Sequence, residues 1–181
     1  MQKKILVTFA SKYGSTGEIA GLIGQELVQS GLAVDVLPVE EVGSLEAYGA
    51  VVLGSAVYAG SWRKDAVDFL EANVQVLAGM PVWIFSSGPT GSGDPQELLK
   101  GWRFPDAQQP LADRIQPQEI ALFHGFLNTD KLNLAEKLLV KGIHAPTGDF
   151  RNWEAIRRWA GRIAIALQGE HAAPAEWKES A

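Results

Sequence analysis

Four hydroxyl side chains lie within six residues near the N-terminus of the chain: Ser11, Tyr13, Ser15 and Thr16. They surround Gly14, follow an apolar run at residues 4–9 and precede a helical pattern, which predicts a turn from a strand into a helix. Such a turn presents unpaired backbone N–H groups at a helix N-terminus, where the helix dipole also favours negative charge. The chemistry that suits this stretch is the binding of a phosphate group by neutral donors.

Two better-known phosphate-binding patterns do not fit this stretch. A P-loop carries Lys and then Ser or Thr directly after its second glycine, whereas Gly17 is followed by Glu18. A dinucleotide-binding turn needs three glycines in the order Gly-x-Gly-x-x-Gly, and only two lie here. An ordinary capped helix start, with Ser15 or Thr16 as the cap and an acid in the first turn, stays open as the alternative.

Two further loops rich in small and hydroxyl residues follow apolar runs, at residues 54–61 and 86–93. In the earlier of the two, small residues admit a flat ligand to the backbone, and Tyr58 or Trp62 is placed to stack on it. The later loop offers backbone amides and hydroxyl groups to the polar edge of a ring. A phosphate loop, an aromatic side chain and a polar glycine-rich loop together match what FMN requires. The alternative is that both aromatic residues only cover the next helix.

Apolar runs and helical patterns alternate along the chain, which predicts an α/β fold with a parallel sheet and helices on both faces. The predicted strands are residues 4–9, 32–37, 50–55, 80–87 and 119–124, and the predicted helices are residues 16–30, 64–77 and 153–167. Five such strands fit the doubly wound order 2-1-3-4-5, in which ligands bind at the carboxyl ends of the strands, between strands one and three. The three loops are therefore expected side by side at one rim of the sheet.

The first loop resembles the phosphate loop of flavodoxins, Thr-x-Thr-Gly-x-Thr, with Ser11, Tyr13, Gly14 and Thr16 in the matching places. Residues 8–16, 54–60 and 148–153 are similar to the flavodoxin-domain family that includes menaquinone-dependent protoporphyrinogen IX dehydrogenase. The similarity covers nearly the whole chain, and its third segment is the most distinctive. It implies a flavodoxin-like fold, FMN bound without a covalent bond, and one-electron or two-electron chemistry at the flavin.

The same resemblance assigns cofactor-binding residues in all three loops. Those of the first loop are Ser11, Lys12, Tyr13, Gly14, Ser15 and Thr16, and all of them except Lys12 are expected to bind the phosphate. Those of the other two loops flank the isoalloxazine ring and are Ser55, Ala56, Val57, Tyr58, Ala59, Gly60, Ser87, Gly88, Pro89, Thr90 and Gly91. No metal site is expected, because the chain has no cysteine and its three histidines lie far apart in sequence. No catalytic residue is identified.

The function that these features predict is an FMN-dependent oxidoreductase, passing electrons between a donor and a small substrate or quinone. Residues 96–117, with Trp102 and Phe104, form a connection long enough to wall a substrate pocket. The alternatives are a flavodoxin-type electron carrier that docks to redox partner proteins and an interaction domain without flavin.

Residues 130–141 depart from the family pattern. The protoporphyrinogen enzymes carry a strongly basic, aromatic stretch here, whereas this chain has an amphipathic segment with three lysines and two acids. The pattern predicts a helix packed on the domain and at most weak peripheral membrane contact. The resemblance therefore leaves open whether protoporphyrinogen is a substrate.

Composition narrows the class of partner. The formal net charge is −5, which argues against nucleic acid, and no apolar run reaches the ~20 residues that span a bilayer. The N-terminus has no signal-peptide pattern, so a cytoplasmic protein is expected. Residues 1–168 are predicted to form one domain and residues 169–181 a flexible tail, and a homodimer stays open.

Four polar residues in the second half of the chain are predicted to have structural roles. His124 ends a strand, where a histidine with satisfied hydrogen bonds is expected near the ligand rim. Asp149 and Arg151 are close enough in sequence for a local ion pair, and Asn152 is suited to cap the last helix.

Overall fold

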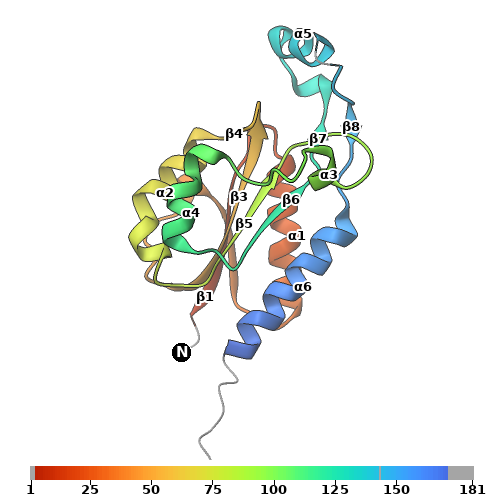
Figure 1. The fold of residues 1–181 in the computed structure, drawn as a ribbon. Coiled ribbons are helices and arrows are strands. Elements are labelled where there is room, and N and C mark those ends of the chain that lie inside the picture. Colours follow the sequence, from red (N-terminus) through yellow and green to blue (C-terminus); the bar gives the residue numbers. More distant parts are fainter. Residues whose placement is uncertain (1–2, 143, 171–181) are drawn as a thin grey trace, which may run out of the picture.

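A central parallel sheet organises the chain in this computed structural model, which describes residues 3–142 and 144–170. Its five long strands are β1 (Lys4–Ala10), β2 (Val34–Pro38), β3 (Tyr48–Tyr58), β5 (Val82–Ser87) and β6 (Glu119–Phe123). Their order is β2-β1-β3-β5-β6, while the short β4 (Ser61–Trp62) pairs antiparallel with the end of β3. The predicted flavodoxin-like order 2-1-3-4-5 is confirmed (Figure 1).

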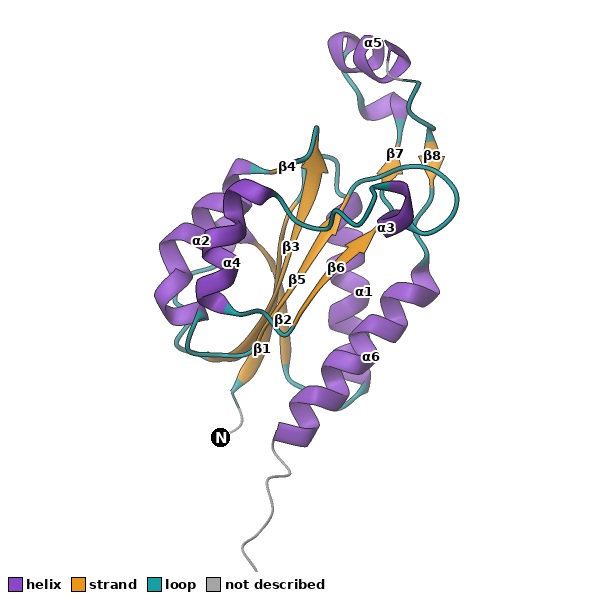
Figure 2. Ribbon diagram, in the orientation of Figure 1, coloured by secondary structure: helices purple, strands orange, loops and turns teal. Residues whose placement is uncertain are grey.

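Helices cover both faces of the sheet (Figure 2). One face carries α1 (Ser15–Gln29) and α6 (Trp153–Glu170), and the other carries α2 (Lys64–Leu77) and α4 (Gln109–Ile115). The shorter helices are α3 (Pro95–Leu98) and three turns of 3-10 helix, η1 (Val39–Glu41), η2 (Asp106–Gln108) and η3 (Thr129–Lys131). The doubly wound arrangement leaves the carboxyl ends of the strands as the open rim of the sheet.

Two buried cores hold the sheet between its helices. Successive strand side chains point to opposite faces, so Ile5 and Val7 pack toward α1 and α6 while Leu6 packs toward α2 and α4. Trp159 of α6 is fully buried and lies edge-on to Phe85 and Phe123 of the sheet. Burial of one such large side chain stabilises a fold by roughly 1.5–3 kcal/mol, so these layers hold the strand ends in place.

A separate structure, which we call the arm (residues 126–149), leaves the rim of the sheet beyond β6 (Figure 1). Its base is an antiparallel pair, β7 (Phe126–Leu127) and β8 (Gly148–Asp149), and its tip is α5 (Leu134–Gly142). Residues 130–141 were predicted to form a helix packed on the domain, and this packing is wrong, because none of α5 is buried and Leu134 is 75% exposed. An amphipathic pattern shows that a helix has an apolar face, but not what covers that face.

The chain ends differ slightly from expectation. Helix α6 continues to Glu170, beyond the predicted end at residue 167, and residues 171–181 of the predicted tail lie outside the described residues. The domain limits therefore stay predictions. No helix within residues 3–142 and 144–170 is long and apolar enough to cross a membrane.

Candidate functional site

The three predicted loops meet at the rim of the sheet and line one cavity of about 520 Å³, which we call the first cavity. Its wall includes Tyr13 and Ser15 from the loop after β1, residues 56–59 from the end of β3, and Ser87, Gly88 and Thr90 from the loop after β5. Gly125 and the arm contribute the remaining wall, and the arm residues include Leu139 and Val140. Sequence reasoning found the three loops but not the arm as the fourth side.

The first loop has the geometry of an anion site. Gly14 is the N-cap residue of α1 and has φ of 93°, a left-handed conformation that favours glycine. The N-cap position belongs to Gly14, and no side chain makes a capping hydrogen bond to α1. The alternative in which Ser15 or Thr16 caps the helix is therefore wrong. The backbone N–H groups of residues 15–17 lie in the first turn, where no intrahelical partner exists. Ser11 Oγ accepts a hydrogen bond of 3.0 Å from the Gly14 N–H and stiffens the turn.

Two of the predicted cofactor residues connect loops instead of facing the cavity. Thr16 is fully buried, and its hydroxyl oxygen lies 3.2 Å from Ser87 Oγ, which joins the first loop to the third. Ser55 is fully buried as well, accepting from the Arg63 N–H at 3.1 Å and donating to the Ala56 carbonyl at 2.9 Å. Both side chains set the spacing of the loops around the cavity.

The second loop is a tight hairpin between β3 and β4. Ala59 and Gly60 form its two-residue turn with φ of 48° and 76°, as a type I′ turn requires. Trp62 is buried, donates from Nε1 to Ser86 Oγ at 2.8 Å and lies edge-on to Phe104. The prediction that Trp62 could stack on a ligand is therefore wrong, and Tyr58, 45% exposed at the cavity, is the aromatic residue left for that role.

His124, which follows β6, contacts the backbone of the third loop. Its two ring nitrogens each lie 2.9 Å from a carbonyl oxygen, that of Pro89 and that of Gly93. The ring is 5% exposed, so the predicted structural role is confirmed, together with its position near the rim. The loop also approaches its neighbours closely, because a Cβ added at Gly88 would lie 2.9 Å from the Val57 carbonyl oxygen.

The arm is bonded to the first loop at its tip. Glu136 accepts hydrogen bonds from Lys12 Nζ and from Tyr13 Oη, the latter at 2.6 Å, while Lys131 Nζ donates to the Tyr13 carbonyl at 3.0 Å. Glu136 and Asn133 also form a reciprocal capping box at the start of α5. The contacts with Lys12, Tyr13 and the Asn133 backbone lower the pKa of Glu136 to about 2. The spacing of Asn133 and Glu136 in the sequence is typical of a capping box, but the sequence does not indicate that Glu136 also bonds to Lys12 and Tyr13.

Arg151 links the base of the arm to α1. Its guanidinium is 4% exposed and pairs with Asp149 at 2.7 Å and with Glu18 at 2.8 Å. The same group donates to the Ser15 carbonyl at 3.3 Å and lies 4.3 Å from the Trp153 ring centroid. The predicted Asp149 pair is confirmed, and the link to the first turn of α1 is an addition that sequence spacing does not reveal.

The predicted cap of the last helix is also confirmed. Asn152 Oδ1 accepts from the Ala155 N–H at 3.0 Å at the start of α6. Because Asn152 directly follows Arg151, the cap and the ion pairs fix the junction between the arm and α6 together.

A second cavity of about 690 Å³ adjoins the first and shares with it Val57, Ala59, Gly88, Thr90 and Ala145. Gly60 and Pro89 also line it, so two more predicted residues lie at this site. Trp102 lines it as expected, whereas Phe104 is buried in the core beside Trp62 and does not. Of the two aromatic residues predicted to wall a substrate pocket, Trp102 therefore lines a cavity at this site and Phe104 does not.

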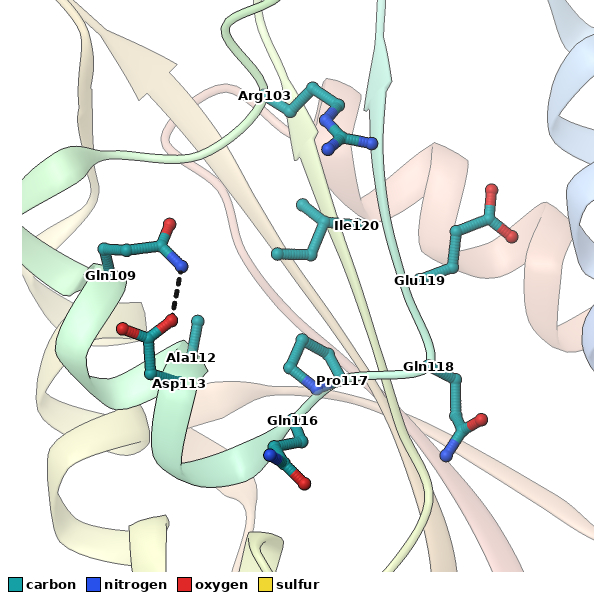
Figure 3. Close-up of a pocket in the computed structure, with 9 residues that line it drawn as sticks. All are labelled: Arg103, Gln109, Ala112, Asp113, Gln116, Pro117, Gln118, Glu119 and Ile120. Carbon is teal, nitrogen blue, oxygen red and sulfur yellow. Dashed lines mark hydrogen bonds between the residues drawn. The ribbon is translucent and has the colours of Figure 1, made fainter.

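Another cavity, of about 560 Å³, lies away from the loops. It is bounded by α4, the turn after it and β6, with Gln109 donating to Asp113 at 2.8 Å along the helix (Figure 3). It contains none of the predicted site residues. Within the described part of the chain, no group of three or more His, Cys, Asp or Glu side chains is arranged to hold a metal ion.

The family follows from comparison with known proteins. A family model described as a flavodoxin domain matches residues 6–153, which is most of the chain. The chain therefore belongs to the flavodoxin domain family, and this membership indicates a redox function that uses a flavin.

Individual relatives are distant but cover nearly the full length. The chain is 22% identical over 172 residues to protoporphyrinogen IX dehydrogenase [quinone] of Escherichia coli K12, covering 89% of this chain and 94% of that protein. It is similar in fold to a flavodoxin from the domain Archaea, with a TM-score of 0.63, 14% identity and coverage of 91% and 99%. It also resembles the flavodoxin of Streptococcus pneumoniae TIGR4, with a TM-score of 0.56, 20% identity and coverage of 90% and 98%.

Proposed function

We propose that this protein binds FMN in the first cavity and is an oxidoreductase passing electrons between a donor and a small substrate or quinone. The observation that carries the proposal is the meeting of all three loops around that cavity. A volume of about 520 Å³ falls in the range of sites for small molecules and cofactors. A bound flavin would supply the electron transfer, and the chain would supply binding, orientation and shielding from water.

Each loop has a separate part in this proposal. The backbone N–H groups of residues 15–17 and the hydroxyls of Ser11 and Ser15 receive the phosphate, aided by the positive end of the α1 dipole. Tyr58 covers one side of the ring from the second loop, and the backbone of residues 87–91 faces its polar edge. The arm closes the cavity with apolar side chains, which limits water access to the ring.

The class of electron acceptor is a further proposal. The activity named for the Escherichia coli relative makes protoporphyrinogen IX and quinones the first substrates to test on this chain. An electron carrier that docks to redox partner proteins is the alternative, supported by the exposed Leu134 and Leu138 on α5, the helix whose Leu139 lines the first cavity. Turnover of a small substrate without any added protein partner favours the oxidoreductase.

FMN binding is tested first, by the visible absorption spectrum after reconstitution and by the dissociation constants of FMN and of riboflavin, which lacks the phosphate. A Ser15→Glu variant places a carboxylate where the phosphate is proposed to bind, while an acid in the first turn favours the helix itself. FMN affinity is expected to fall about 100-fold, equivalent to about 2.7 kcal/mol, with riboflavin affinity nearly unchanged.

Gln25→Glu is the matched control, because it adds the same charge at an exposed position of the same helix. It is expected to leave both affinities unchanged. Failure of the wild-type protein to take up FMN would refute the proposal, and an equal loss of FMN and riboflavin in Ser15→Glu would refute the assigned phosphate position.

A further inference from the structure

The second cavity has walls of a different character from those of the first. Leu98, Leu99 and Trp102, from α3 and the segment after it, form one wall, and Ala145 and Pro146 of the arm form another. The remaining lining comes from the loop edges at residues 59–60 and 88–90, which also border the first cavity. Anything bound here therefore lies directly beside the proposed ring site.

The charge of this lining limits what it can hold. None of the described residues that line the second cavity is Lys, Arg, Asp or Glu, and His144 is the one titratable side chain among them. An ionised carboxylate taken out of water without a cationic partner is strongly disfavoured. An apolar ring loses little on entering, because leucine, proline and tryptophan surfaces replace water around it.

We propose that the second cavity binds an uncharged, flat ring compound beside the cofactor, as the electron acceptor. A quinone bound there would take two electrons and two protons from the reduced cofactor, leaving the cofactor oxidised, and would depart as the hydroquinone. This inference rests on the proposed function and names the substrate class of the same site. Trp102 is the specificity-determining side chain, because it is the one described aromatic residue that lines this cavity. A tetrapyrrole with ionised carboxylates is disfavoured here, since no Lys or Arg among the described lining residues would pair with them.

The test compares two probes with the same ring system, neutral 1,4-naphthoquinone and anionic 1,4-naphthoquinone-2-sulfonate, bound to the oxidised FMN-loaded protein. The chain has no cysteine, so thiol addition to the quinones cannot obscure the measurement. Equilibrium dialysis at pH 8 gives both dissociation constants. The neutral probe is expected to bind at least tenfold more tightly than the sulfonate.

Two variants locate this preference in the cavity. Trp102→Ala is expected to weaken binding of the neutral probe by about tenfold, and Trp102→Phe to restore most of it, since a ring remains. Leu98→Lys places a cation at the cavity wall, at a side chain already 46% exposed, and is expected to strengthen sulfonate binding several-fold. Gln96→Ala, exposed in the same helix but outside the lining, is the matched control and is expected to change neither probe.

The outcomes separate this inference from the proposed function. A protein that takes up no FMN overturns the proposed function. A protein that takes up FMN yet binds both probes equally, or whose Trp102→Ala and Leu98→Lys variants match wild type, overturns the inference alone. Tighter neutral-probe binding that depends on Trp102, with sulfonate binding gained in Leu98→Lys, supports it.

Discussion

Glu136 is the residue through which the arm and the first loop contact each other most directly. Its carboxylate accepts hydrogen bonds from the side chains of Lys12 and Tyr13. It also accepts a hydrogen bond from the Asn133 N–H, which caps the start of α5. Lys12 and Tyr13 directly precede Gly14, so the loop that is proposed to bind the phosphate also holds the arm. A single carboxylate thus couples the arm to the geometry of the loop.

The pH dependence of this contact has a defined sign. The folded-state pKa of Glu136 is about 2, below its ordinary value of 4.5, so the charged carboxylate stabilises the closed arm. That stabilisation is complete above pH 4.5 and is lost as the pH falls toward 2. A carbon-13 NMR titration of the Glu136 carboxyl is expected to show a midpoint near 2, whereas a midpoint near 4.5 would show that the contacts do not persist in solution.

A substitution tests the same contact at constant pH. Glu136→Gln removes the charge that Lys12 requires, and amide hydrogen exchange in residues 134–142 is expected to become several-fold faster at pH 7. Lys137→Gln serves as the control. It removes a charge from the same helix, and the Lys137 side chain makes no described hydrogen bond. Equal exchange in wild type and Glu136→Gln would contradict a holding role for the carboxylate.

At the scale of elements, the close approach of the second and third loops depends on Gly88. A Cβ added at Gly88 would lie 2.9 Å from the Val57 carbonyl oxygen, and a Cβ added at Gly125 would lie 3.1 Å from the Gly88 Cα. These three chain segments come from the ends of β3, β5 and β6, so their spacing is set at the rim of the sheet. Glycine is needed at position 88 because backbone atoms, and not flexible side-chain tips, occupy the space.

Gly88→Ala is therefore expected to push the third loop away from the second. Such overpacking costs about 1–3 kcal/mol of unfolding free energy, and FMN and riboflavin affinities are expected to fall together, since the ring and not the phosphate loses its contacts. Gly161→Ala in α6 is the control, because its Cβ meets nothing within 4 Å and a helical alanine adds about 0.5–1 kcal/mol of stability. Unchanged FMN and riboflavin affinities in Gly88→Ala would refute the role of the spacing between the second and third loops.

The sheet and the three loops could be predicted from the sequence, because long apolar runs and glycine-rich turns leave local patterns. The two-residue strands β7 and β8 leave none, and the place of α5 depends on that pair. Trp62 was misplaced for a similar reason, since its partners Ser86 and Phe104 are distant in sequence. The pairs of Glu136 with Lys12 and of Arg151 with Glu18 could not be predicted, because the partners lie more than 100 residues apart in sequence.

At the scale of the whole molecule, stability and the candidate site lie in different places. Both buried cores lie between the sheet and its four main helices, whereas the first and second cavities lie at the rim, between the loops and the arm. Of the described residues from 128 to 147, Leu132 is the one that is buried. The arm therefore adds cavity wall while the rest of the fold supplies the stability.

Replacing residues 128–147 by a short Asn-Gly turn tests this division of roles. Leu127 and Gly148 are antiparallel partners, so such a turn can join them. The melting temperature is expected to fall by no more than about 5 °C, whereas FMN dissociates at least tenfold faster and KM for 1,4-naphthoquinone rises, because walls of both cavities are removed.

Leu139→Ser is expected to give part of the increase in the FMN dissociation rate, and Leu138→Ser none. The two leucines are equally exposed, but of the two Leu139 alone lines the first cavity. Global unfolding of the shortened protein would place the arm in the core instead, and unchanged FMN release from a stable one would favour an electron carrier whose flavin lies open to its partners.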